Sequence, residues 1–240
     1  MESPSVHLDD ASSVVAAVEG HVPYLRIALA APPDEGWLAS AALIEQPALL
    51  RGSIASTQAG RGAPDLQVAA SLWFQAYAFR AAVPVVAPFA LGLPGFSADP
   101  QATSIRIARS RPAAVAVTDP AVRDRSAEAA AQELLAGHLE PVAEAVAASH
   151  TVGHRLLWGN AAASVAAVLR AVEGAPGANR AVVRARAGEL VDAAQPWIAG
   201  LGSFELGEQG WRWGRTNCCL YDRCDGASRC EDCSLQAVAS

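Results

Sequence analysis

The sequence predicts an α+β protein that is predominantly α-helical, a helical body with a minor β element and a small cysteine-bearing segment at its C-terminal end. Three observations predict it: apolar residues recur at helical spacing over most of the chain, two short segments alternate apolar and polar residues, and all five cysteines lie within residues 218–233. The 240 residues are enough for one large domain with an appendage. We expect a mainly helical domain over residues 1–200 and a separate C-terminal segment over 201–240.

In the first sixty residues the start and stop signals predict short elements. A serine or aspartate cap predicts a helix over residues 12–18 that ends by Gly20. Residues 24–29 are expected to form a strand and residues 36–44 a helix. A further helix is predicted over residues 47–59, with a proline at its first turn, where the missing N–H has no helical partner.

The strongest helical pattern covers residues 65–82. One face of this helix collects the apolar and small residues Leu66, Ala69, Ala70, Trp73, Tyr77 and Ala81. Pro84 is expected to stop or kink the helix, with a second short helix over residues 85–91 and a loop at residues 92–96.

After this loop, the spacing of apolar residues changes from the helical period to alternation. Residues 104–109 and 114–118 alternate apolar and polar side chains around Arg111-Pro112, which predicts a β-hairpin near residues 104–118. Beyond it, three helices are predicted and then a glycine-punctuated linker. The helices cover residues 124–149 (with a kink at Pro141), 151–172 and 178–194, and the linker covers 197–210.

Composition excludes several classes of protein. A net charge of −6, without a basic stripe bearing interleaved aromatic residues, argues against a nucleic-acid partner. Hydrophobic residues make up 52% of the chain, but much of this is alanine and no run of eighteen apolar residues suggests a transmembrane segment. The first residues lack the basic and apolar regions of a signal peptide. We therefore expect a cytoplasmic protein, in which a cysteine cluster is more often metal-binding than disulfide-bonded.

The cysteine spacing is C-C-x10-C-x2-C, formed by Cys218, Cys219, Cys230 and Cys233. Adjacent side chains of an extended segment point to opposite sides, so Cys218 and Cys219 converge poorly on one tetrahedral zinc ion. A two-iron cluster offers separate attachment points, and the spacing therefore favours a 2Fe–2S centre over zinc or a disulfide, which remain alternatives. The fifth cysteine, Cys224, is expected to be a spare thiol.

Two segments carry a resemblance to a known family. Arg215-Thr-Asn-Cys218-Cys219-Leu-Tyr221, followed by Cys230-x-x-Cys233, resembles the C-terminal signature of the FhuF-type ferric siderophore reductases. The segment Arg155-Leu-Leu-Trp158-Gly159-Asn160 resembles the "LWGN" helix start of the same family. The resemblance implies that the four cysteines of the motif hold a 2Fe–2S cluster. The extra Cys224, and Ser234 in place of a frequent proline, depart from the family pattern.

The resemblance also implies a function. A protein of this kind reduces a ferric siderophore, which we expect to be of the hydroxamate type, by one electron and releases Fe(II) in the cytosol. Its helical domain would face the siderophore, with Arg155, Trp158, Asn160 and Arg215 as substrate-binding candidates and no catalytic residue beyond the cluster. Since no GxGxxG fingerprint follows a strand, we expect an external electron donor such as a ferredoxin or a reductase. The alternatives are a siderophore-binding or redox-sensing iron–sulfur protein without catalysis, and a helical protein with a structural zinc site.

Overall fold

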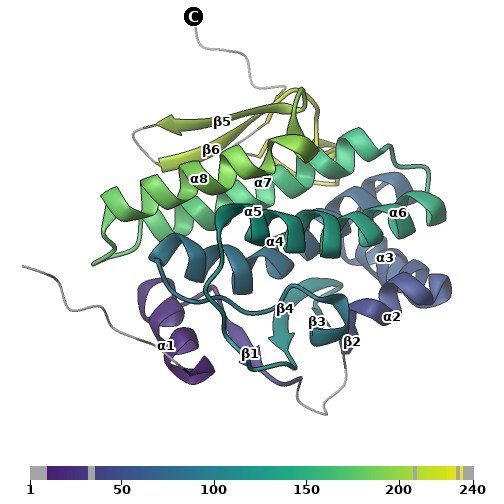
Figure 1. Ribbon diagram of the computed structural model, residues 1–240. Coiled ribbons are helices and arrows are strands. Elements are labelled where there is room, and N and C mark those ends of the chain that lie inside the picture. The colour runs from purple at the N-terminus through teal and green to yellow at the C-terminus, as the bar shows by residue number, and fades with distance from the viewer. Residues whose placement is uncertain (1–9, 32–35, 208–209, 231–232, 235–240) are drawn as a thin grey trace, which may run out of the picture.

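The computed structural model describes residues 10–31, 36–207, 210–230 and 233–234, and its elements surround one long central helix (Figure 1). The helices are α1 (Ala11–His21), α2 (Ser40–Glu45), α3 (Pro47–Arg61), α4 (Leu66–Leu91), α5 (Ala127–Ala131), α6 (Glu140–Ser149), α7 (His154–Glu173) and α8 (Arg180–Ile198). The strands are β1 (Ile27–Leu29), β2 (Trp37–Ala39), β3 (Thr103–Ala108), β4 (Arg111–Val117), β5 (Gly202–Gly207) and β6 (Gly210–Arg215). Two short 3-10 helices and one π-helix complete the described elements: η1 (Pro100–Ala102), η3 (Tyr221–Arg223) and the π-helical η2 (Gln132–Leu139). The predominantly α-helical α+β class is confirmed.

Helix α4 is the axis of the fold. It begins at the N-cap Asp65, whose side chain accepts a hydrogen bond from the Val68 N–H at 2.8 Å, and ends at Gly92 in the left-handed conformation. Of the predicted stop or kink at Pro84, the stop is wrong, because the helix continues through Pro84 and Pro88 to Leu91 and residues 85–91 are not a separate helix. An interior proline costs a helix about 3 kcal/mol. Burial of nearly every residue from Ala81 to Ala90 offsets that cost.

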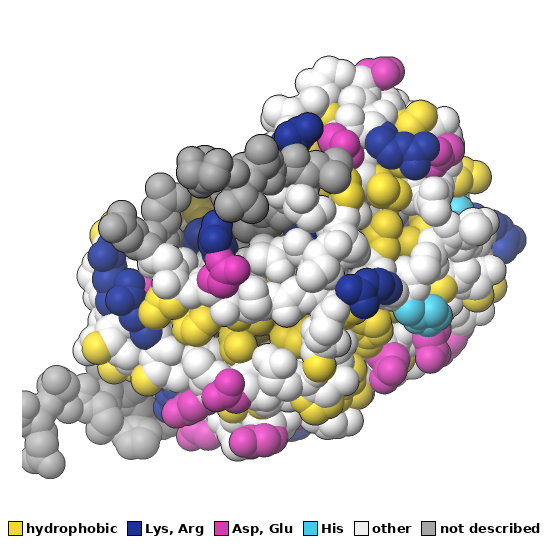
Figure 2. Space-filling view, turned by 90° about the horizontal axis from the view of Figure 1, so that it is seen from above, with side chains coloured by type: hydrophobic (Ala, Val, Ile, Leu, Met, Phe, Trp, Pro, Cys, Tyr) yellow, Lys and Arg dark blue, Asp and Glu magenta, His cyan; other side chains and the backbone are white. Residues whose placement is uncertain are grey.

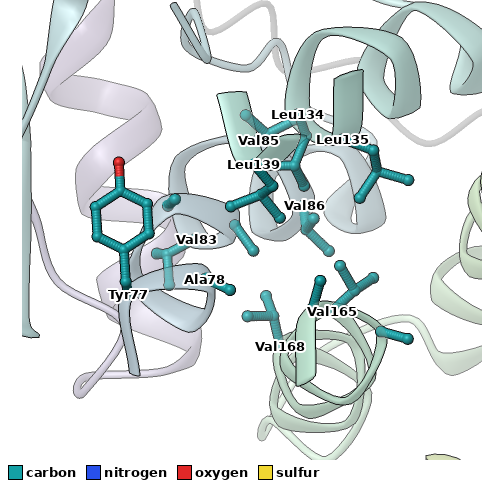
Figure 3. Close-up of a cluster of buried hydrophobic side chains, with 14 of the residues drawn as sticks. Tyr77, Ala78, Val83, Val85, Val86, Leu134, Leu135, Leu139, Val165 and Val168 are labelled. Carbon is teal, nitrogen blue, oxygen red and sulfur yellow. The ribbon is translucent and has the colours of Figure 1, made fainter. Parts of the chain in front are cut away.

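The core lies where α4 meets α7 and the π-helical segment. Figure 3 shows valines of α4 facing Leu134, Leu135 and Leu139 on one side and Val165 and Val168 of α7 on another. By length and composition α4 resembles a membrane span, but 72% of its most apolar window is buried inside the fold. The packing therefore accounts for its hydrophobicity as that of a core helix.

The predicted hairpin exists as β3 and β4, within a four-stranded sheet of order β1-β4-β3-β2. Arg109 and Ser110 form its turn with positive φ angles, and β1 lies parallel to β4 while the other pairs are antiparallel. The helix predicted over residues 36–44 is partly wrong, because Trp37–Ala39 pair with β3 as a strand and only the residues from Ser40 are helical. Pairing with a distant strand overrides the local helical preference.

The long helix predicted over residues 124–149 is confirmed with two differences. It starts at Ala127, where the Ser126 side chain accepts a hydrogen bond from the Ala129 N–H at 3.2 Å. The irregularity expected at Pro141 lies just before it, as the π-helical η2. A proline cannot donate to the preceding turn, and a π segment is one way in which a helix accommodates that loss.

The linker predicted over residues 197–210 is wrong in its second half, where β5 and β6 form a hairpin that lies over α7 and α8 (Figure 1). Phe204 pairs with Trp213, and their rings are 4.8 Å apart. Gly202 is required by this hairpin, because its φ is +157° and a Cβ there would meet the Gly214 carbonyl oxygen. The hairpin leads directly into the cysteines.

Candidate metal centre

The cysteine-bearing segment is held against the ends of α3 and α4 by three contacts. The Asp225 N–H donates to the Gly62 carbonyl at 3.2 Å, directly after α3. Arg223 forms an ion pair with Asp65 at 3.1 Å. Within α4, the Ser71 hydroxyl donates to the Cys219 carbonyl at 2.8 Å. The segment is therefore part of the folded body rather than a free tail.

Two of the four predicted ligands lie side by side. The Sγ atoms of Cys219 and Cys230 are 3.7 Å apart. Two thiolates on one tetrahedral metal ion, each about 2.3 Å from it, lie about 3.8 Å from each other. This pair therefore has the spacing of two ligands on a single iron or zinc ion.

Cys218 makes contacts different from those of Cys219. Its Sγ lies 3.3 Å from an Asp222 carboxylate oxygen and accepts a hydrogen bond from the Leu220 N–H at 3.2 Å. Leu220 has a positive φ of 68°, which turns the chain immediately after the cysteine pair. Cys218 and Cys219 therefore have different neighbours, Asp222 and Cys230 respectively.

The remaining two cysteines are both buried. Cys233 lies one turn after Cys230, with its N–H bonded to the Cys230 carbonyl at 3.1 Å. Cys224 packs with the hydrophobic core. Within the described ranges no three side chains of Cys, His, Asp or Glu converge on one metal position, and Glu231 and Asp232 fall outside those ranges. Assignment of all four cysteines of the motif as ligands stays a prediction.

The close pair also has unequal proton affinities. The hydrogen bond from Cys230 lowers the pKa of Cys219 to about 6, and the same contact raises the pKa of Cys230. Burial raises the pKa of Cys218 to about 11. The Cys219–Cys230 pair therefore shares one proton when no metal is bound, and the thiolate that a metal needs is already favoured at Cys219.

A buried polar network connects the two motifs found in the sequence. Arg215 donates from Nη1 to Asn160 Oδ1 at 2.8 Å, and Asn160 Nδ2 donates to the Ser71 hydroxyl at 2.9 Å and to the Ser71 carbonyl at 3.0 Å. The Ser71 hydroxyl in turn holds Cys219. The Nε and Nη2 atoms of Arg215 are buried and have no hydrogen-bond partner among the described residues, and the guanidinium charge lowers the pKa of Cys219. Buried, unpaired donors beside a thiolate pair suit an anionic cluster with thiolate and sulfide ligands.

The four residues predicted to bind substrate lie around this network. Asn160 is fully buried, Arg215 is 7% exposed, and Trp158 is half-buried against the core. Arg155 donates to the Gly200 carbonyl at 2.9 Å and to the Thr216 hydroxyl at 3.0 Å, which joins α7 to the hairpin segment. None of the four lines the cavity at the cysteines. Direct contact of these residues with a substrate stays a prediction, while their observed contacts position the cysteine segment.

A cavity of about 430 Å³ opens beside the close pair, with Cys219 and Cys230 in its wall. Its other walls come from the end of α3, from α4, from the start of β4 and from α7. Each of these elements contributes one arginine: Arg61, Arg80, Arg111 and Arg170. The sequence pattern did not predict these four arginines as site residues. Only the tertiary structure brings together single arginines from four separate elements of an arginine-rich chain.

Comparison with known families matches the part of the chain that precedes the cysteine segment. A family model described as "Ferric iron reductase FhuF-like transporter" matches residues 71–195. The chain belongs to this family of ferric iron reductase-like proteins. The matched region runs from Ser71 to residue 195 within α8 and includes Asn160 and much of the cavity wall, while the cysteine segment follows it. None of the curated proteins compared with the chain matches it.

Proposed function

We propose that this protein reduces the iron of ferric siderophores by one electron in the cytosol, using a 2Fe–2S cluster bound by Cys218, Cys219, Cys230 and Cys233. Membership of the ferric iron reductase-like family supports the reaction class. One observation carries the rest: two of the proposed ligand sulfurs, Cys219 and Cys230, stand 3.7 Å apart in the wall of a cavity large enough for a chelate.

When bound, a 2Fe–2S cluster would supply one electron at a time, which is the stoichiometry of Fe(III) reduction. Cys219 and Cys230 have the spacing of two ligands on one iron, and Cys218 and Cys233 would complete the set. The charge of Arg215 lowers the pKa of Cys219, and the Ser71 hydroxyl fixes the Cys219 backbone. These residues hold the ligands in place and exclude water from them.

The proposed reaction is balanced in electrons. The ferric ion gains one electron, and an external donor returns one electron to the protein. Fe(II) binds the hard oxygen ligands of a siderophore more weakly than Fe(III), so reduction allows the iron to leave. Because the sequence lacks a nucleotide-binding fingerprint, the proposed donor is a ferredoxin or a flavin-dependent reductase.

The test begins with protein purified without exposure to air. We expect visible absorption that bleaches on reduction, with roughly two irons and two inorganic sulfides per chain. Under turnover with a reductant, a ferric siderophore should yield Fe(II) that a ferrous chelator traps. Colourless protein with one zinc ion and no sulfide would refute the cluster, and a stable cluster without Fe(II) production would refute the enzymatic role.

Two matched cysteine variants test the ligand assignment. Cys230→Ser should lose the iron and the sulfide, because it removes one of the two close sulfurs. Cys224→Ser should keep both, because Cys224 packs with the hydrophobic core and is not one of the four cysteines of the motif. Full cluster content in Cys230→Ser would show that the ligand set is wrong.

A further inference from the structure

The cavity beside Cys219 and Cys230 has an unusual charge. Arg61, Arg80, Arg111 and Arg170 line it, and its described wall contains neither aspartate nor glutamate. Arginine keeps its charge under all physiological conditions. The wall is therefore strongly cationic, although the chain as a whole carries a net charge of −6.

Three of these charges have no carboxylate partner among the residues that the structure describes. Within the described parts of the chain, Arg61, Arg80 and Arg111 form no ion pair, whereas arginines elsewhere do, such as Arg125 with Glu133 at 3.1 Å and Arg184 with Glu173 at 2.5 Å. Burial lowers the pKa of Arg80, and the charge of Arg111 lowers it further. The two guanidinium groups thus repel each other across the cavity, and an anion between them would relieve that repulsion. Figure 2, which views the molecule from above, shows arginine side chains next to hydrophobic ones on the face that carries the β5–β6 hairpin.

The rest of the wall is apolar and aromatic. Phe79 and Tyr221 contribute rings, and the Arg80 guanidinium lies 5.1 Å from the centre of the Phe79 ring. Planar guanidinium groups and aromatic rings both stack on flat aromatic ligands. The wall therefore combines charge pairing with surfaces for aromatic rings.

We infer that this cavity binds ferric chelates of net negative charge, with aromatic catecholate groups against Phe79 and Tyr221 and their oxygens toward the arginines. This inference rests on the proposed function and replaces the hydroxamate type expected from the sequence. Three dianionic catecholates around a trivalent ion leave three negative charges, whereas three hydroxamates leave none. A neutral trihydroxamate would offer these arginines no countercharge.

The same charges favour the reaction itself. An anionic ferric chelate becomes more negative by one charge when its iron is reduced. The surrounding arginines therefore stabilise the ferrous complex more than the ferric one, which is the differential binding that promotes electron transfer. With a cationic wall, a highly anionic chelate is a better electron acceptor in the cavity than in water.

The test uses gallium(III) chelates, because gallium(III) matches iron(III) in charge and size but is not reduced. Binding of a gallium tris-catecholate and of a neutral gallium trihydroxamate to the full, anaerobically purified protein is measured by equilibrium dialysis. We expect the tris-catecholate to bind at least tenfold more tightly, and its affinity to fall as salt is raised. Equal affinities, tighter binding of the trihydroxamate, or no binding of either would overturn the inference.

Arginine variants show whether the cavity is the site. Arg80→Gln and Arg111→Gln should each weaken tris-catecholate binding by roughly tenfold and leave trihydroxamate binding unchanged. Arg111 is exposed at the start of β4, so its variant tests the site even if Arg80→Gln folds poorly. The control is Arg123→Gln, an exposed arginine paired with Asp119 and outside the cavity, which should have no effect. Unchanged tris-catecholate binding in Arg111→Gln would overturn the inference.

Two further outcomes separate this inference from the proposed function. Tight binding of the gallium tris-catecholate without reduction of its ferric counterpart would refute the reductase and leave the binding site standing. Reduction of neutral ferric trihydroxamates in preference to anionic chelates would refute the binding inference and leave the reductase function standing. Displacement of the gallium chelate by flavin mononucleotide at comparable concentration would assign the cavity to the electron donor and overturn the inference.

Discussion

Arg215 donates a 2.8 Å hydrogen bond to the side-chain oxygen of Asn160, although the two residues are 55 positions apart. Asn160 lies in the "LWGN" segment of α7, and Arg215 lies three residues before the first cysteine. Through Ser71, the same asparagine is connected to the Cys219 carbonyl. The two motifs are therefore parts of one buried network, and the network positions the cysteine pair.

Asn160→Ala should destabilise the protein by about 3 kcal/mol or more. The change removes the only described hydrogen-bond acceptor of a buried guanidinium group and both donors to Ser71. Urea unfolding measures the loss. Asn179→Ala is the control, because it removes only an exposed N-cap of α8 and should cost about 1 kcal/mol. Equal losses in the two variants would show that the network does not stabilise the fold.

Gly159→Ala should disturb the cysteine segment and leave α7 helical. A Cβ at position 159 would lie 2.5 Å from Asn217 Oδ1, and Asn217 directly precedes Cys218. We expect a cost of about 1 to 3 kcal/mol and a lower iron content. Gly188→Ala in α8 is the matched control, since nothing lies within 4 Å of its Cβ. That variant should gain roughly 0.5 to 1 kcal/mol and keep its iron. Unchanged iron content in Gly159→Ala would contradict the proposed coupling.

His138 makes the stability of the protein depend on pH. It is buried between the Tyr77 hydroxyl at 2.7 Å and the Ala98 carbonyl, and burial lowers the pKa of His138 from 6.5 to about 4. The carbonyl accepts from Nδ1, so Nε2 accepts the tyrosine proton and the ring is neutral. Below pH 6.5 the unfolded chain binds a proton that the folded protein does not bind until about pH 4.

The contribution of neutral His138 to stability should therefore be fully present above pH 6.5. The free energy of unfolding should fall by about 3 kcal/mol as the pH is lowered from 6.5 to 4. Urea unfolding across this range measures the slope. In His138→Gln the loss of unfolding free energy between pH 6.5 and 4 should be smaller by about 3 kcal/mol, so the slope should be flatter, although the variant is less stable overall. An unchanged slope in the variant would mean that other groups cause the acid sensitivity.

The ion pair between Arg223 and Asp65 should contribute little by itself. Both side chains are more than two-fifths exposed, and pairs of this kind stabilise a protein by less than about 1 kcal/mol. Asp65 also caps α4 through the Val68 N–H, so Asp65→Ala should cost about 1 kcal/mol more than Arg223→Ala. Thermal unfolding of the two single variants compares them. Equal losses would indicate that the cap is unimportant.

Local patterns predicted most of the helices. Apolar residues at helical spacing identified the stretches that became α3, α7 and α8, and alternation identified β3 and β4, because these preferences act within a few residues. The cysteine spacing likewise singled out the segment at the cavity. Its family resemblance agrees with the ferric iron reductase-like family to which the chain belongs.

Other features were decided only by tertiary contacts. Burial of the surrounding residues allows α4 to continue through Pro84, and pairing with β3 makes residues Trp37–Ala39 a strand. The β5–β6 hairpin was missed because its glycines resemble a linker, although Phe204, Leu206, Trp211 and Trp213 alternate with polar or small residues. The signal was present, but the ring contacts between the two strands make it a hairpin.

The sequence by itself determined most of the helices and the β3–β4 hairpin, and it placed all five cysteines in one short segment, since these features depend on short-range spacing. Only the tertiary structure decided what surrounds the cysteines. Arg61, Arg80 and Arg111 come from three elements with no shared pattern, and their unpaired charges meet only after α3, α4 and β4 have packed. A charge distribution around a cavity depends on distances in space, and spacing along the chain does not encode those distances.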